Sequence, residues 1–122
     1  MKKVFFVLIG LFAGLCHGQI TIQNPIMSGF YPDPSITRVG DDFYMTASSF
    51  NCIPGLPILH SKDLVNWKIV SYAYDVLDSS DALALNNGKV DYGRGSWASC
   101  LRLHKGIYYL STFSGTTGKT NI

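Results

Sequence analysis

The chain has 122 residues and carries ten Lys and Arg side chains against eight acidic ones, which gives a formal net charge of +2. All eight acids are Asp, and the sequence contains no Glu. This near-balanced charge, with no Lys- and Arg-rich cluster, argues against nucleic acid as a partner. About a hundred residues are enough for one small domain.

The first eighteen residues are typical of an export signal. Lys2 and Lys3 form a short basic head, residues 4–15 form an apolar core, and Gly18 is a small residue before an expected cleavage ahead of Gln19. A membrane-spanning helix needs roughly 20 apolar residues, so this core is too short to be an anchor. Its removal leaves eight basic and eight acidic residues, and hence a mature net charge of about zero.

We therefore expect a signal peptide at residues 1–18 and a mature chain at 19–122. The mature chain is expected to be secreted or periplasmic, without stable membrane insertion. Cys16 suggests lipid attachment as an alternative. Leu15 stands where such a site usually has a small residue, so lipid attachment is disfavoured.

The mature chain keeps two cysteines, Cys52 and Cys100. In an exported chain they could pair, although two residues define no disulfide framework. Both lie in apolar neighbourhoods, so buried free thiols are an equal alternative, and their redox state stays open.

Short β-rich runs separated by polar turns occupy the first half of the mature chain. β-Branched and aromatic residues flank Gly and Asp turn residues, which is a hairpin signal. The runs are too apolar for a sheet that is wetted on one face, so we expect both faces to be covered. The predicted strands are 35–39, 43–48, 57–60 and 68–72. Residues 75–92 then predict a long loop with one helical turn near 81–85.

The hairpin pattern returns further along the chain. Residues 99–109 overlay residues 35–45 at an offset of 64, with Ser, Arg and Tyr coinciding. A repeated four-stranded unit is typical of a β-propeller blade, with chance similarity of two hairpins as the alternative. The chain stops after a turn-like segment at 114–118, where another strand should begin, so we expect it to be a fragment of a longer protein.

The segment Gly29-Phe30-Tyr31-Pro32-Asp33-Pro34-Ser35 places one acid between two prolines, just before the first strand. Proline fixes its own φ and biases the preceding residue toward extended conformations. We therefore predict a stiff, extended segment that holds the Asp33 carboxylate at the mouth of the strand, as a reacting carboxylate requires. An ordinary loop turn is the alternative.

The repeat also gives Asp33 a partner, because at an offset of 64 it corresponds to Trp97. In a propeller the innermost strands line a central funnel. Asp33 and Trp97 are therefore expected to face a shared cavity. An acid beside an aromatic ring suits a sugar, whose apolar face stacks on rings while its hydroxyls bind carboxylates.

Several blocks of the mature chain, in order, resemble the opening of glycoside hydrolase family 43, in its β-xylosidase and α-L-arabinofuranosidase branch. The resembling blocks are 24–26, 29–35, 40–44, 49–50, 54–58, 60–67 and 96–98. The resemblance implies an all-β, five-bladed β-propeller, of which only the first blade and part of the second are present. It also implies an inverting mechanism in which two carboxyl groups stand roughly 6.5–9.5 Å apart.

The resemblance also implies roles for individual residues. Asp33 falls on the general base, and Phe50 and Trp97 fall on aromatics of the substrate-binding pocket. The general acid is a Glu on a later blade, which this chain does not contain. A third family acid, an Asp that adjusts the general acid, would stand near Ser114. No cofactor and no metal ligand set are expected, and a structural calcium ion, as in some relatives, is left open.

The resulting hypothesis is an exported hydrolase that cleaves xylosyl or arabinofuranosyl linkages in plant hemicellulose or pectin-derived glycans. Its partner is an oligosaccharide or polysaccharide, and this chain alone is expected to be inactive. One alternative is a non-catalytic carbohydrate-binding propeller, which Ser114 in place of an Asp supports. Another is a retaining propeller hydrolase with Asp33 as the nucleophile. Sequence does not separate xylosidase from arabinofuranosidase, nor does it give the oligomeric state.

Overall fold

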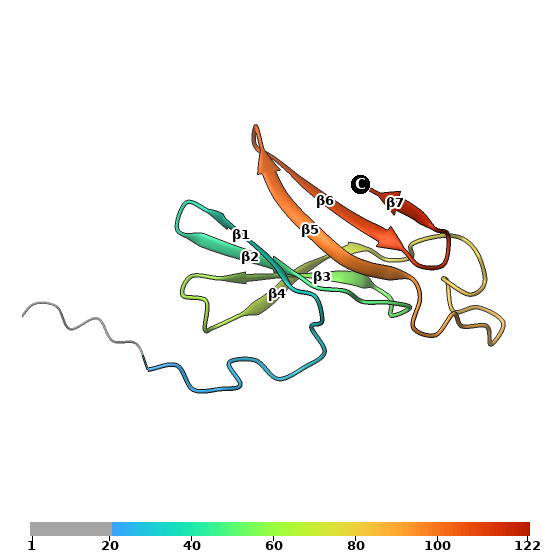
Figure 1. Cartoon of the computed structure of the whole chain (residues 1–122), viewed down its shortest axis with the longest axis horizontal. Helices are drawn as coiled ribbons and strands as arrows, with labels where there is room; N and C mark the ends of the chain where they lie inside the picture. The colour runs from blue at the N-terminus through green and yellow to red at the C-terminus, as the bar shows by residue number, and fades with distance from the viewer. Residues whose placement is uncertain (1–20) are drawn as a thin grey trace, which may run out of the picture.

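A computed structural model describes residues 21–122, which form two antiparallel β-sheets and contain no helix (Figure 1). The first sheet has the order β1-β2-β3-β4, and the second has the order β5-β6-β7. The strands are β1 (Ser35–Val39), β2 (Asp42–Thr46), β3 (Gly55–Ser61), β4 (Lys68–Tyr74), β5 (Ser96–His104), β6 (Ile107–Ser114) and β7 (Lys119–Asn121). The expected signal peptide lies outside the described residues.

The first sheet has the four predicted strands. Its first hairpin turns at Gly40 and Asp41, and Gly40 has a φ of 60°, a conformation that glycine adopts without steric cost. β3 and β4 are longer than predicted, because the pairing between them extends to Gly55 of β3 and Tyr74 of β4. The predicted helical turn in the long loop is present as a single turn, in which Ala84 N donates to Ser80 O at 2.9 Å.

The second sheet packs on a face of the first, and β5 crosses β1, β2 and β3 (Figure 1). Consecutive residues of β2, Met45 and Thr46, are both buried, so this strand is covered on both faces as predicted. β4 differs, since six of its seven residues are exposed. The buried apolar side chains are Met45, Ala47, Leu56, Leu59, Leu83 and Leu101.

The repeat is confirmed as a structural one, but the offset of 64 is wrong by one residue. The first hairpin pairs Ser35 with Thr46, and the second pairs Cys100 with Ser111. The offset of the two hairpins is therefore 65. The identical Ser, Arg and Tyr letters that suggested 64 do not occupy equivalent places, because hydrogen-bond register and not letter identity defines equivalence in a sheet.

A β-bulge occurs at the head of both sheets. In the second sheet the register shifts between Trp97 and Cys100, and Ala98 has a φ of 20°. In the first sheet Ser48 N donates to Pro32 O at 2.9 Å, ahead of β1, and Asp33 has a φ of 52°. Both sheets thus place two residues opposite one, as a bulge does.

The bulge corrects the expected partner of Asp33. Pro32 faces Ser48 as Trp97 faces Phe113, so Pro32 corresponds to Trp97. Asp33 therefore corresponds to Ala98, the next residue along. Two sheets that share a hairpin, a bulge and a face-to-face contact have the arrangement expected of successive blades of a β-propeller.

Backbone hydrogen bonds join the two sheets at a single bridge. Phe50 N donates to Ser96 O at 3.0 Å, and Ser96 N donates to Phe50 O at 2.9 Å. Gly95 permits this approach, because a Cβ atom on it would lie 2.0 Å from Phe50 O. Gly95 also has a φ of 79°, a left-handed conformation that other residues rarely adopt.

The block at 60–67, one of those that resemble the family, forms a turn held by Asp63. The Asp63 carboxylate accepts hydrogen bonds from Val65 N at 2.9 Å and from Asn66 N and Nδ2, each at 2.7 Å. Trp67 Nε1 donates to Leu64 O at 3.0 Å. The Asn66 backbone N–H, its side chain and the Val65 N–H together hold the pKa of Asp63 well below its usual range.

Gly95→Ala should destabilise the protein more than a matched substitution in open space. Gly88 has a φ of 66° and no atom within 4 Å of the place that a Cβ would take, so Gly88→Ala incurs only the left-handed cost of about 1–2 kcal/mol. Gly95→Ala adds a backbone clash and should lower the free energy of unfolding by about 3 kcal/mol. Equal values for the two variants in denaturant unfolding would contradict the bridge.

Asp63→Asn should lower stability in a pH-dependent way. The folded pKa of Asp63 lies below its ordinary value of 3.8, so its contribution is full above that value and is lost as the pH falls through the folded pKa. The difference in unfolding temperature between wild type and Asp63→Asn should therefore shrink on acidification below 3.8. Asp41→Asn, at an exposed carboxylate 3.6 Å from Arg38, is the control. A constant difference for Asp63→Asn would refute this role.

Candidate active site

One end of the two sheets gathers the residues that sequence reasoning singled out. At this end β1, β3 and β5 begin and β2, β4 and β6 end, as the pairs Ser35–Thr46, Gly55–Tyr74 and Ser96–Ser114 show. Asp33, Phe50 and Trp97 belong to the segments that enter or leave these strand ends. Shared placement at one rim follows from antiparallel pairing.

Asp33 lies at the mouth of β1 as predicted, but its backbone is not extended. Its φ of 52° is left-handed, and the residue is exposed. Pro34 favours an extended backbone at the preceding residue, but the bulge imposes a left-handed one. A left-handed conformation costs of order 1–3 kcal/mol. Asp tolerates the left-handed region better than most residues. The bulge turns the Asp33 side chain relative to the alternation of the strand.

The Asp33 carboxylate is held by one hydroxyl. Ser48 Oγ donates to Asp33 Oδ2 at 2.8 Å, and Ser48 is 1% exposed. The same residue donates its backbone N–H to Pro32 O at 2.9 Å. Ser48 thus fixes both the backbone before Asp33 and one oxygen of its carboxylate. Sequence reasoning missed Ser48, because only the pairing of the two strands brings it to Asp33.

Phe50 is half-buried at the bridge between the sheets. Its ring centroid lies 5.8 Å from that of Phe30, in a tilted contact. Its N–H and C=O are both engaged with Ser96. The ring therefore has a fixed backbone and an aromatic neighbour, which is what a stacking platform for a ligand needs.

Trp97 is 38% exposed, with its indole fixed on three sides. Its Nε1 donates to Gly93 O at 3.0 Å, and its ring centroid lies 5.9 Å from that of Phe113. Gly115 contacts the indole so closely that a Cβ there would lie 2.6 Å from two ring atoms. An exposed indole in one orientation has the form of a sugar-stacking surface.

A continuous chain of contacts links the three predicted site residues. Ser48 binds Asp33, Phe50 follows two residues later, and Phe50 is bridged to Ser96, which precedes Trp97. The described contacts establish this common rim. They do not include a direct contact between Asp33 and Trp97, so the shared cavity stays a prediction.

Tyr74 supports the rim from below, and sequence reasoning gave no sign of it. Its hydroxyl bonds to Ser96 Oγ and lies 3.4 Å from Ser49 Oγ. Its ring lies on Gly55, where a Cβ would be 2.1 Å from a ring atom. Because Ser96 carries the bridge to Phe50, Tyr74 braces the joint that sets the distance between the two sheets.

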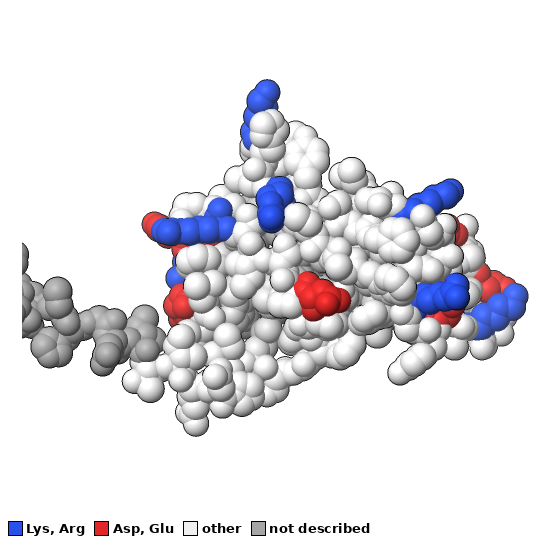
Figure 2. Space-filling view, in the orientation of Figure 1, with Lys and Arg blue, Asp and Glu red and all other residues white. Residues whose placement is uncertain are grey.

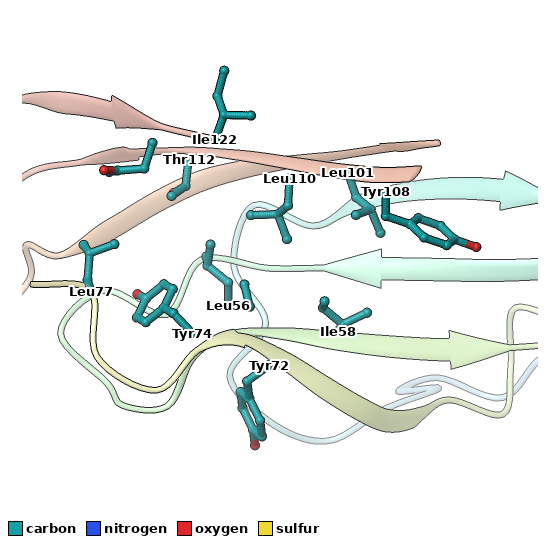
Figure 3. A pocket seen from close by; sticks show the side chains of 12 residues that line it. Leu56, Ile58, Tyr72, Tyr74, Leu77, Leu101, Tyr108, Leu110, Thr112 and Ile122 are labelled. Carbon is teal, nitrogen blue, oxygen red and sulfur yellow. The ribbon is translucent and has the colours of Figure 1, made fainter. Parts of the chain in front are cut away.

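Two hollows border this region. One of about 310 Å³ lies beside the rim and is lined by Ser48 and by the aromatic side chains of Phe30, Tyr31 and Tyr72. The other, of about 490 Å³, lies between the sheets, where Leu56, Leu110 and other apolar side chains point toward one another (Figure 3). Its walls are mainly apolar, as in an inter-blade packing space, and none of the three predicted site residues lines it.

The other end of the sheets carries a cluster of polar side chains that contains none of the predicted site residues. Asp42 accepts from Lys62 Nζ at 2.7 Å and from His60 Nε2 at 2.5 Å, and these two bonds hold the pKa of Asp42 below its ordinary value. Tyr44 packs on Tyr108 at 5.4 Å across the sheets. Burial, and then the hydrogen bond to Tyr44, raise the pKa of Tyr108. The Asp42 cluster stabilises the first sheet, and the Tyr44–Tyr108 contact joins the two sheets.

Ser114, near the place of the third family acid, is fully buried and accepts from Thr117 N at 3.2 Å. It is the last residue of β6, at the start of the turn that leads to β7. Cys52 and Cys100 are both free, and Cys52 is exposed because it lies in the loop after Phe50, contrary to the buried alternative.

Within residues 21–122, no three His, Cys, Asp or Glu side chains gather as a metal site would require.

The distribution of charged side chains on the surface agrees with the nearly balanced charge of the sequence. On the face seen in Figure 2, Lys and Arg side chains are scattered toward the edges, and most of the surface is uncharged. In the described part of the chain, no helix is long and apolar enough to cross a membrane.

Comparison with known proteins gives the family. Residues 22–122 match the family described as Glycosyl hydrolases family 43. The chain is 42% identical over 109 residues to the non-reducing end alpha-L-arabinofuranosidase BoGH43B of Bacteroides ovatus, covering 88% of this chain and 20% of that protein. It is 43% identical over 100 residues to a xylosidase/arabinosidase of Butyrivibrio fibrisolvens, covering 82% of this chain and 18% of that protein.

Solved structures agree in fold as well as in sequence. The bifunctional GH43-CE protein of Bacteroides eggerthii superposes with a TM-score of 0.76 at 54% identity, over 84% of this chain and 13% of that one. The xylan beta-1,4-xylosidase of Bacillus halodurans superposes with a TM-score of 0.63 at 43% identity, over 75% of this chain and 17% of that one. The chain thus spans about a fifth or less of these relatives. It belongs to glycoside hydrolase family 43, and its two sheets are the first blade and part of the second blade of a five-bladed β-propeller.

Proposed function

We propose that Asp33 is the general base of an exported glycoside hydrolase that cleaves xylosyl or arabinofuranosyl linkages with inversion. The observation that carries the proposal is the exposed Asp33 carboxylate, held by buried Ser48 at a bulge on the rim that also bears Phe50 and Trp97. The relatives named as xylosidases and arabinofuranosidases support the substrate class. Export rests on residues 1–18, which have the composition of a signal peptide.

The mechanism follows from the chemistry of a carboxylate beside a sugar platform. Phe50 and Trp97 would hold the apolar face of a sugar ring through stacking. Asp33 would take a proton from a water molecule as that water attacks the anomeric carbon. Inversion also needs a carboxylic acid that protonates the leaving oxygen on the opposite side. Since the chain has no Glu, we propose that this acid comes from a later part of a longer protein.

The repeat indicates that Asp33 is not required for the fold. Ala98 occupies the corresponding place in the second blade and also has a positive φ, so a methyl side chain is compatible with the bulge. A carboxylate kept at a strained position, where the backbone does not need it, is a candidate for function.

Asp33→Ala in the full-length protein should lower kcat/KM on aryl xyloside and aryl arabinofuranoside by roughly 10²- to 10⁴-fold, because general-base catalysis is lost. Its unfolding temperature should fall only by what the lost Ser48–Asp33 hydrogen bond contributes, since Ala98 shows that the bulge accepts a methyl side chain. Asp41→Ala, which removes an exposed carboxylate at the far turn, is the matched control and should keep full activity. Normal turnover by Asp33→Ala would remove Asp33 from the reaction.

Two further measurements separate the alternatives. Proton NMR of the first-formed anomer should show inversion, whereas retention would assign Asp33 as a nucleophile. Binding isotherms with product analysis would identify a non-catalytic sugar-binding propeller if oligosaccharide binds and is not cleaved.

Residues 19–122 produced alone should show no turnover on the same substrates, because a general acid is missing from them. A discontinuous assay at high protein concentration is the appropriate measurement. Cleavage by this segment would contradict the division of the catalytic groups proposed above.

A further inference from the structure

We propose that Ser48 is a positioning residue for the general base, and that it keeps the Asp33 carboxylate aimed at the attacking water. This inference rests on the function proposed above for Asp33. Its geometric basis is the 2.8 Å hydrogen bond from Ser48 Oγ to Asp33 Oδ2, made by a side chain with 1% exposure.

The hydrogen bond divides the two carboxylate oxygens. Oδ2 is engaged by Ser48, and among residues 21–122 Oδ1 has no hydrogen-bond partner. A hydrogen bond is directional, so this one fixes the orientation of the carboxylate group. Oδ1 is then the oxygen that can accept a proton from water.

Ser48 has little freedom to move away from this role. Its backbone N–H is bonded to Pro32 O at 2.9 Å, and its side chain is buried. A donor fixed by its own backbone holds its acceptor with low entropic cost. Asp33 is itself exposed, so Ser48 supplies the rigid half of the pair.

The second blade supplies an internal comparison. In it Ala98 stands in place of Asp33 and Phe113 in place of Ser48, yet the bulge and the strand pairing are the same. The polar pair is therefore dispensable for this backbone geometry. A buried hydroxyl and a carboxylate that the fold does not demand, present together in the blade that bears the general base, point to a role in the reaction.

The test is the separate measurement of kcat and KM for Ser48→Ala in the full-length protein. Loss of the hydrogen bond that orients the base should lower kcat by roughly 10- to 100-fold and leave KM nearly unchanged. Ser48→Thr should restore kcat, since it keeps the hydroxyl and the adjoining hollow of about 310 Å³ has room for a methyl group.

Ser99→Ala is the matched control, because Ser99 is also buried and its hydroxyl lies 3.1 Å from Thr46 Oγ1 rather than near a carboxylate. Ser99→Ala and Ser48→Ala should lower the unfolding temperature by similar amounts, but only Ser48→Ala should lower kcat. An unchanged kcat in Ser48→Ala, with Asp33→Ala inactive, would overturn the role of Ser48 alone. Activity in Asp33→Ala would overturn the proposed function itself.

Discussion

The arrangement of this molecule depends on one pair of backbone hydrogen bonds, those between Phe50 and Ser96. They join the loop that leaves the second strand of one blade to the first strand of the next. Gly95 makes the approach sterically feasible, and the Tyr74 hydroxyl braces it through Ser96 Oγ. Phe50 is in the bridge and Trp97 follows Ser96 directly, so the contact that joins the blades also holds these two aromatic residues at one rim.

The bulge is the second element on which the site depends. It recurs in both blades, so it belongs to the architecture and was not introduced for catalysis. What differs is the residue placed on it, which is Asp33 in the first blade and Ala98 in the second. The β-bulge is thus common to both blades, and the first blade differs by the Asp33 carboxylate and the buried Ser48 hydroxyl that binds it. The same logic separates structure from function in other repeat folds, where individual repeats carry the active groups.

The sequence predicted the elements well and the equivalences less well. Alternating β-branched residues and Gly/Asp turns were sufficient for the first four strands and for the existence of a second hairpin. The offset between hairpins was wrong by one residue because chance identities, such as Arg38 and Arg102, outweighed the position of the turns. The extended backbone predicted for Asp33 was wrong because pairing across the bulge overrides the local effect of Pro34. Ser48 and Tyr74 act through partners 15 and 22 residues away, which local patterns do not indicate.

The bridge between the blades brings Asp33, Phe50 and Trp97 to one rim, and we propose that this rim binds the sugar. A crystal structure of the full-length protein with bound xylose or arabinose tests this most directly. We expect a sugar ring against Phe50 and Trp97, and an ordered water on Asp33 Oδ1 while Ser48 holds Oδ2. A sugar bound away from these aromatic rings, with the Asp33 carboxylate turned from its anomeric carbon, would contradict this assignment.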